Sequence, residues 1–299
     1  MLAKKLVTQR KMDGFNGQKA IVLPYKIIKS CEDTRLVQQL LITDIGFYPK
    51  AKFHYRERLV GVSQHIFIYC IDGKGWFSVD NEEHKISRGQ FFIIPANTAH
   101  NYGSQEDDPW SIYWLHFKGT SSDNFVNLLT REKTQFYGIV NFAEERIRLF
   151  DDIYRTLKNG YSAENLGYIN MCLWHFLSSF CYPDVFRKLF NKDQKDVIDI
   201  SIDFMQQHLS ESLTLRQLAS EANVSPSHYS SLFKKKTGYP PLEYFSHIKV
   251  QAACQYLQFT TLRIKEISYK LGIDDPYYFS RLFSNLMGQS PLRYRNRKQ

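Results

Sequence analysis

The chain has 299 residues, of which 43% are hydrophobic and 15% aromatic, and this balance excludes a largely disordered chain. Its 39 lysines and arginines exceed the 30 aspartates and glutamates, and the net charge of +9 favours an anionic partner. The five cysteines are widely spaced without a CxxC pair, so neither a disulfide framework nor a thiolate zinc site is indicated. With no signal segment and no run near the roughly 18 apolar residues of a membrane span, we expect two or three domains in the cytoplasm and no membrane partner.

The first part of the chain is rich in β-branched and aromatic residues in short runs. Between about 21 and 117 these runs are separated by turn sequences such as Gly73-Lys74-Gly75, which predicts an all-β sandwich or barrel. The segment from Gly89 to His100 fits the second half of the cupin signature, G-x5-P-x-G-x2-H, with Asn97 where glycine is usual. Asparagine tolerates a left-handed turn, so the departure is mild.

A metal site is not expected in this β domain. Metal-binding cupins carry a His-x-His pair followed by a glutamate, and the corresponding stretch, residues 54–65, has no such pair. A full ligand set cannot be collected from it, so neither metal nor cofactor is predicted. His100 is either a turn histidine satisfied by hydrogen bonds or a ligand contact.

Polar and aromatic residues alternate along two of the expected strands. If residues 54–58 are extended, three basic side chains share one face: His54, Arg56 and Arg58. A later strand carries on one face Ile112, Trp114 and His116. An inward arginine needs oxygen atoms to accept its donors, so this cluster suits a small polar ligand on an aromatic platform. The alternative is that Arg58 is exposed in a loop and Trp114 belongs to the core.

Helical periodicity replaces the strand pattern after Lys118-Gly119. Apolar residues three and four apart predict a helix over 142–159 and another over 163–180. The wide apolar stripe of the second helix can pack on the neighbouring domain or on a copy of itself, and we expect a homodimer. Pro183 and the polar run 191–195 predict a linker over 183–195.

One sequence pattern occurs twice near the C-terminus. The segments 229–244 and 279–294 share seven identities in register, which indicates one supersecondary unit used twice. Each follows a short amphipathic helix and a turn, at Asn223 or Gly272, that are typical of a helix-turn-helix motif. A helix over 242–257 joins the two motifs, and it would let both second helices enter major-groove faces ~34 Å apart on one duplex.

The second helix of each motif is the expected recognition helix. The residues expected to face the core are Tyr229, Leu232 and Phe233 in the first motif and Phe279, Leu282 and Phe283 in the second. The outward face then carries Ser227, His228, Ser230, Ser231 and Lys234 in the first, and Tyr277, Tyr278, Ser280, Arg281 and Ser284 in the second. The guanidinium of Arg281 suits a guanine edge.

This combination resembles the AraC/XylS family of bacterial transcription regulators, in which a cupin-like sensor domain precedes two helix-turn-helix motifs. The resemblance covers 212–295, where the second motif reads IKEISYKLGIDDPYYFSRLFSNLMGQSPLRYR, and 58–119, which includes PWSIYWLHFKG. It implies an α+β multidomain chain. The expected parts are a cupin-like β-barrel with an N-terminal arm over 1–140, a helical hairpin over 141–182, a linker over 183–195 and an all-α DNA-binding domain over 196–299 with motifs at about 213–236 and 264–287.

The resemblance also implies functional residues. In the sensor it implies a sugar-hydroxyl contact at Arg58, a donor at Tyr102 and a stacking platform at Trp114. With two neighbouring histidines, the predicted ligand-binding set is Arg58, Tyr102, Trp114, His100 and His116. Ile112 stands where the arabinose-type pocket has a histidine, so a different sugar is expected, and residues 18–24 resemble the arm that can lie over bound ligand. The predicted DNA-binding set is Ser227, Ser230, Ser231, Lys234, Pro276, Tyr277 and Arg281.

We therefore predict a regulator, not an enzyme, that binds double-stranded DNA as a homodimer and responds to a small effector, a sugar, in its cupin domain. RNA polymerase is a further candidate partner. In one alternative the cupin domain only dimerises, and Arg58 and Trp114 then line no pocket. In another the chain is a cupin enzyme with an accessory domain, which would require a metal in the purified protein.

Overall fold

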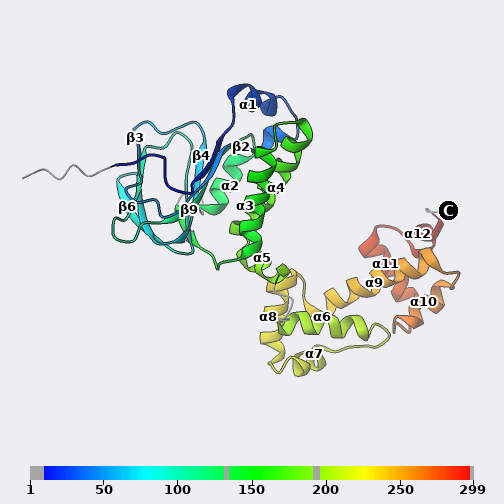
Figure 1. The fold of residues 1–299 in the computed structure, drawn as a ribbon. Coiled ribbons are helices and arrows are strands. Elements are labelled where there is room, and N and C mark those ends of the chain that lie inside the picture. Colours follow the sequence, from blue (N-terminus) through cyan, green and yellow to red (C-terminus); the bar gives the residue numbers. More distant parts are fainter. Residues whose placement is uncertain (1–9, 131–134, 191–195, 297–299) are drawn as a thin grey trace, which may run out of the picture. The chain divides into compact units, whose positions relative to one another are not determined.

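The computed structural model describes residues 10–130, 135–190 and 196–296, and it divides into two compact units, residues 1–191 and 192–299 (Figure 1). All the described strands lie in the first unit, and the described part of the second unit is helical. None of the described helices is both long and apolar enough to cross a membrane.

The strands of the first unit form two antiparallel sheets. The larger sheet has the order β1-β2-β9-β4-β7-β10 and the smaller sheet the order β3-β8-β5-β6. The bounds are β1 Lys19–Val22, β2 Leu41–Tyr48, β3 Tyr55–Arg58, β4 His65–Asp72, β5 Lys74–Val79, β6 Glu82–Ser87, β7 Gln90–Ile94, β8 His100–Ser104, β9 Ser111–Lys118 and β10 Tyr137–Ile139. The predicted β-rich, cupin-like sensor fold is confirmed, with its strands arranged as two sheets.

The larger sheet separates two apolar cores. Side chains alternate along a strand, so in β4 Ile68 points to the smaller sheet while Phe67 points to the helices. Between the sheets, the rings of Phe77 and Phe92 stack with centroids 4.4 Å apart. On the other face, Phe67 packs edge-on against Phe180, at 4.7 Å between centroids. One sheet thus connects a sandwich interior to a helical layer.

Most helices of the first unit pack on the outer face of the larger sheet, and the last one packs against the helix before it. The helices are α1 Tyr25–Glu32, the 3-10 helix η1 Val37–Gln39, α2 Ser122–Leu129, α3 Glu144–Lys158, α4 Ala163–Cys181 and α5 Pro183–Phe190. The predicted hairpin is confirmed as α3 and α4, which run side by side (Figure 1). The stripe of α4 is buried in the core through Ile169, Leu173, Phe176, Leu177 and Phe180. Most of this stripe therefore packs within its own chain.

Two predictions from the sequence were wrong. Residues 183–190 form α5 and are not a linker, because Phe186 is buried beneath the guanidinium of Arg146, whose Cζ lies 5.1 Å from its ring centroid. Pro183 begins this helix, where its missing N–H costs nothing. The rest of the predicted linker, 191–195, lies outside the described residues. Residues 37–39, which lie in the part of the chain where the sequence predicts only short strands, form η1.

The second unit contains both predicted helix-turn-helix motifs. Its helices are α6 Val197–Gln207, α7 Leu215–Glu221, α8 Pro226–Thr237, α9 Pro241–Phe259, α10 Ile264–Lys270, α11 Pro276–Met287 and α12 Pro291–Asn296. The first motif is α7 with α8 and the second is α10 with α11. Between them runs α9 (Figure 1), about 28 Å long at 1.5 Å per residue. Each motif has its own core, around Phe233 in the first and Phe283 in the second.

The buried His54 makes the stability of the first unit depend on pH. It lies between the sheets, where its Nδ1 accepts a hydrogen bond from Trp110 Nε1 at 3.2 Å. Burial lowers the pKa of His54 from 6.5 to about 3. Between pH 6.5 and about pH 3, His54 therefore binds a proton in the unfolded chain but not in the folded chain. The free energy of unfolding falls as the pH drops below about 6.5.

We predict that His54→Gln flattens this dependence, since glutamine can accept the same hydrogen bond but takes no proton. One proton corresponds to about 1.4 kcal/mol per pH unit. All four tryptophans lie in the first unit, so their fluorescence can follow its urea unfolding at about pH 7.5 and about pH 5. An equally steep loss of stability in the variant would contradict the assignment. Burial also lowers the pKa of His65 and His100, so part of the dependence should persist.

Candidate ligand cavity and nucleic-acid interface

A cavity of about 140 Å³ lies between the two sheets of the first unit. Strands of both sheets and the N-terminal arm contribute to its wall. The lining residues are Asp13, Ala20, Val22, Asp44, Tyr48, His54, Arg56, Arg58, Ile66, Ile68, Tyr102, Ile112, Trp114 and His116. The expected alternation is confirmed, since both strand faces inferred from the sequence point into this cavity.

The guanidinium of Arg58 is held by neutral groups. Its Nη1 lies 3.2 Å from His100 Nε2 and 3.5 Å from the hydroxyl of Tyr102. Since arginine only donates, His100 Nε2 must accept, and Nδ1 carries the hydrogen that is donated to the Thr98 carbonyl at 2.7 Å. Burial lowers the pKa of His100, which keeps this neutral form. The remaining N–H groups of Arg58 can bind a ligand.

A carboxylate supplies the complementary acceptor. Asp44 on β2 faces His116 on β9, with 3.4 Å between Oδ2 and Nδ1. The hydroxyl of Thr43 donates to the same oxygen at 2.7 Å. Burial opposes ionisation of Asp44, but His116 and Thr43 outweigh it and hold the pKa of the carboxyl below its usual value. The cavity therefore offers both fixed donors and a fixed acceptor.

The indole of Trp114 fits because its neighbour on β2 has no side chain. Gly46 pairs with Trp114 across the sheet, and a Cβ at that glycine would lie 2.4 Å from Trp114 Cζ2. Trp114 is 9% exposed and lines the cavity. Its buried Nε1 has no hydrogen-bond partner in the described part of the chain. A buried donor without a partner costs free energy, so a ligand that accepts from it would gain affinity.

The N-terminal arm closes one side of the cavity. β1 is the edge strand of the larger sheet and pairs with β2, and the arm before it brings Asp13 to the cavity wall. Phe15 is buried against Tyr48, at 5.0 Å between ring centroids. The side chain of Gln18 accepts from the backbone N–H groups of Gly14 and Phe15, both at 2.8 Å. The arm is longer than the expected 18–24 and folds as an ordered turn onto the sheets.

Four of the five predicted ligand residues line the cavity, namely Arg58, Tyr102, Trp114 and His116. His100 lies behind Arg58 and orients it. The sequence reasoning missed Asp13, Tyr48 and Asp44. A signal for Asp44 existed, because it is a lone charge inside the apolar run LITDIGFY. Within the described ranges, no three His, Cys, Asp or Glu side chains are grouped so that they could hold a metal ion.

The two recognition helices begin at the expected turns. Asn223 and Gly272 both have positive φ, at 54° and 61°, as predicted for a helix-turn-helix turn. The hydroxyl of Ser225 accepts from the N–H of His228 at 3.4 Å and so caps α8. The carboxylate of Asp275 accepts from the N–H of Tyr277 at 2.8 Å and caps α11.

Most of the predicted DNA-binding side chains are on the surface. The exposed ones are Ser227, Ser231, Lys234, Tyr277 and Arg281. The half-buried ones are Ser230 and Pro276. Neither Lys234 nor Arg281 makes a side-chain hydrogen bond or ion pair within the described residues, so both charges are available. The expected core position of Leu232 was wrong, because it is 37% exposed at the edge of the stripe formed by Tyr229 and Phe233. Leu282, its counterpart, packs against the second core.

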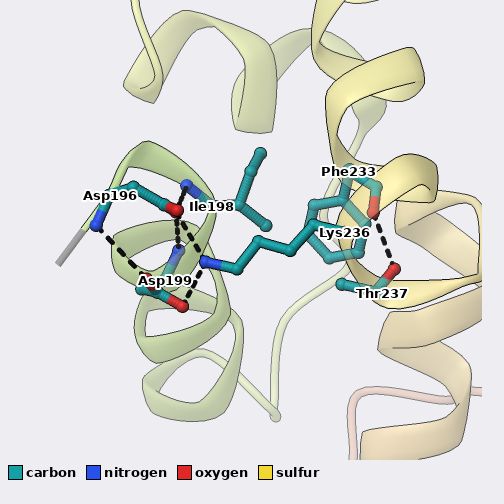
Figure 2. A network of polar contacts seen from close by, with 6 residues as sticks. All are labelled: Asp196, Ile198, Asp199, Phe233, Lys236 and Thr237. Atoms are coloured by element: carbon teal, nitrogen blue, oxygen red, sulfur yellow. Dashed lines mark hydrogen bonds and ion pairs between the residues drawn. The ribbon is translucent and has the colours of Figure 1, made fainter. Parts of the chain in front are cut away.

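One lysine of the run 234–236 is already paired within the protein. Figure 2 shows the Nζ of Lys236 between Asp196 and Asp199, 2.6 Å from Asp196 Oδ1. Asp196 also caps α6, since its Oδ1 accepts from the N–H groups of Ile198 and Asp199 at 3.0 and 3.1 Å. Burial opposes the charge of Lys236, but the two carboxylates outweigh it and raise its pKa. Lys236 thus fastens the end of α8 to the start of α6 and is not a free cation for DNA.

Comparisons with known proteins agree with the fold of both units of the chain. Residues 51–168 match the AraC-like ligand binding domain, and residues 218–297 match a helix-turn-helix domain. The MmsAB operon regulatory protein of Pseudomonas aeruginosa is 29% identical over 92% of this chain and 89% of its own. The lactose operon transcription activator of Staphylococcus xylosus is 26% identical over 75% and 81%, and the raffinose operon transcriptional regulatory protein of Pediococcus pentosaceus is 24% identical over 77% and 84%. The chain belongs to the AraC/XylS family of DNA-binding transcriptional regulators.

Proposed function

We propose that this regulator senses a sugar in the cavity between its sheets, has no enzymatic activity and acts in the cytoplasm. The observation that carries the proposal is the set of fixed groups around Trp114, with the spare N–H donors of Arg58 and the carboxylate of Asp44. Two relatives are named for lactose and raffinose operons, which supports a sugar as the effector class.

The chemistry of the cavity matches a single sugar ring. Each sugar hydroxyl both donates and accepts, so it can be bound by Arg58 and Asp44 together. The apolar face of a pyranose can stack on the indole of Trp114. The volume of about 140 Å³ lies below the ~300 to 1,000 Å³ of drug-sized sites, so a monosaccharide, or one ring of a larger sugar, is the expected occupant.

The alternative in which the sensor only dimerises fits the cavity less well. A half-buried guanidinium such as that of Arg58 costs stability unless its N–H donors are accepted, and among the described residues only its Nη1 has partners, His100 and Tyr102. An unpaired indole N–H adds to this cost. A ligand that hydrogen-bonds to these groups would offset their cost. We propose that the ligand then changes the dimer contacts or the orientation of the DNA-binding domain, which requires that it binds the two states with different affinity.

We predict that Trp114→Ala abolishes sugar binding and leaves DNA affinity unchanged. The measurement is a thermal-shift screen of monosaccharides and oligosaccharides, since a ligand at 100 times its Kd stabilises the folded state by about 2.7 kcal/mol. Trp114→Phe keeps an aromatic face and removes the N–H, so it should retain part of the shift. Trp76→Phe, outside the cavity lining, is the matched control. A Trp114→Ala protein with the full sugar-induced shift would contradict the pocket assignment.

In the DNA-binding half, we propose that α8 and α11 read two unlike half-sites on one duplex. The first helix presents hydroxyl groups and Lys234, whereas the second presents a guanidinium, Arg281, beside Tyr277, which is 83% exposed. Arginine recognises the two acceptors of a guanine edge, and a serine hydroxyl discriminates bases less strongly. Contact with RNA polymerase stays a prediction.

We predict that Arg281→Ala weakens binding to the preferred DNA by about 1 to 3 kcal/mol and relaxes preference at one base position. The check is selection of duplexes from a random pool with the wild-type and variant proteins, followed by affinity measurement. Lys234→Ala is the comparison, because loss of a phosphate contact should weaken all sequences alike and lower the salt dependence. Unchanged base preference in Arg281→Ala would remove this residue as a base reader.

We also propose that the chain is a homodimer through the exposed side of α2 and α4. An apolar groove of about 550 Å³ lies there, lined by Asn124, Phe125, Leu128, Met171, Trp174, His175, Ser178 and Tyr182. Met171 is 59% and Leu128 46% exposed, so this surface lacks a cover in the single chain. A second copy can cover it symmetrically, as most soluble oligomers do.

We predict that Met171→Asp yields a monomer, because the carboxylate would have to be buried at the interface. Sedimentation equilibrium of wild type and variant measures the effect. Val185→Asp, also 59% exposed but outside the groove, should leave the mass unchanged. A dimeric Met171→Asp protein, or a monomeric wild type, would contradict the proposed interface.

A further inference from the structure

The loop between α6 and α7 contacts both helix-turn-helix motifs. It spans residues 208–214, and its Leu209 packs against the core of the first motif and against the core of the second. The loop does more than connect α6 to α7. The loop therefore has contacts that can fix the two motifs relative to each other, in addition to the joining helix α9.

A buried lysine fastens the loop to the middle of α9. Lys249 is 6% exposed, and its Nζ donates to the backbone carbonyl of Glu211 at 2.7 Å. On α9 it follows Ile248, which packs in the first core, and precedes Val250, which packs in the second. Burial lowers the pKa of Lys249, and no neighbouring charge among the described residues offsets this. Burial of an ammonium group without a counter-charge costs free energy, and the hydrogen bond to the Glu211 carbonyl offsets part of that cost.

The turn of the second motif touches the same loop. A Cβ at Gly272 would lie 2.2 Å from the carbonyl oxygen of Ser210, so only glycine permits this approach. At the matching turn of the first motif stands Asn223, with similar positive φ and an exposed side chain. The left-handed turn alone therefore accepts asparagine. The glycine in the second motif is explained by the backbone contact to the loop.

We propose that the loop 208–214, held by Lys249 and Gly272, is a clamp that sets the spacing at which the two recognition helices read DNA. The inference rests on the proposed reading of one duplex by both motifs. Lys249 and Gly272 are positioning residues and contact no base. When two binding elements are rigidly held, the second one binds with a high effective concentration only at the matching separation. Loosening the clamp should lower the affinity for DNA whose half-sites have the matching spacing. It should also reduce the loss of affinity for DNA with other spacings.

The test uses the full-length chain and duplexes selected by it from a random pool. One or two base pairs are then inserted between the two halves of the selected sequence, each rotating one half by about 34° around the DNA axis. Affinities are measured for wild type, Lys249→Met and Gly272→Ala. The matched controls are Glu211→Ala, which keeps the backbone acceptor, and Gly288→Ala, which has a similar φ of +69° but no atom within 4 Å of its Cβ position.

For wild type, one inserted pair should lower affinity by more than about tenfold, since one half-site then falls out of register. In Lys249→Met and Gly272→Ala, affinity for the uninterrupted sequence should fall by about fivefold, and the insertion penalty should shrink to less than about threefold. The controls should match wild type. If one of the two variants does not fold by thermal melting, the other decides.

Two outcomes would overturn the inference, and they are distinguishable. A folded Lys249→Met or Gly272→Ala protein with the wild-type insertion penalty would contradict the clamp while leaving two-motif reading intact. An equal loss of affinity for all duplexes in either variant would show that the residue has only a structural role. That result would also contradict the clamp. A wild-type protein insensitive to insertion would instead contradict the reading of one duplex by both motifs, and the clamp with it.

Discussion

The sensor half depends on how a guanidinium is accommodated between two apolar sheets. Arg58 is half-buried, and its hydrogen-bond partners among the described residues are the neutral groups of His100 and Tyr102. A charge in such a place is tolerated when its donors are accepted and a counter-charge is near. The neutral state of His100 supplies the first acceptor, and Asp44 holds its negative charge in the same cavity. The remaining donors face an open space, so the interior is organised around a molecule with several hydroxyl groups.

The DNA-binding half contains one helix-turn-helix scaffold twice, and the two copies differ in the contacts that anchor them to the rest of the domain. Both recognition helices bury an aromatic pair four residues apart and end at a glycine with positive φ, Gly238 or Gly288. The differences lie around this scaffold. The first helix is tied to α6 through Lys236, whereas the second motif touches the loop before α7 through Gly272. Thus each copy is anchored by its own contact, and the two copies are neither independent nor interchangeable.

The sequence predicted the elements with strong periodicity and missed those set by tertiary contacts. Alternation placed Trp114 and His116 in the cavity, and turn chemistry placed Asn223 and Gly272, because these follow from backbone geometry alone. Short strands such as β10 carry too few residues for a period. The helix α5 was mistaken for a linker, since what holds Phe186 is a guanidinium distant in the sequence. Lys249 was missed for the same reason, because the Glu211 carbonyl that accepts from it belongs to another element.

The central claim is that a sugar in the cavity changes how the protein binds DNA. The most direct measurement is the DNA affinity of the full-length chain, on a duplex selected by it, with and without the sugar that raises its melting temperature most. Coupling between two sites is typically about 1 to 3 kcal/mol, so we expect the affinity to change by at least about fivefold. By reciprocity, the duplex should change sugar affinity by the same factor. A sugar that binds the cavity but leaves DNA affinity unchanged on every selected duplex would contradict the account.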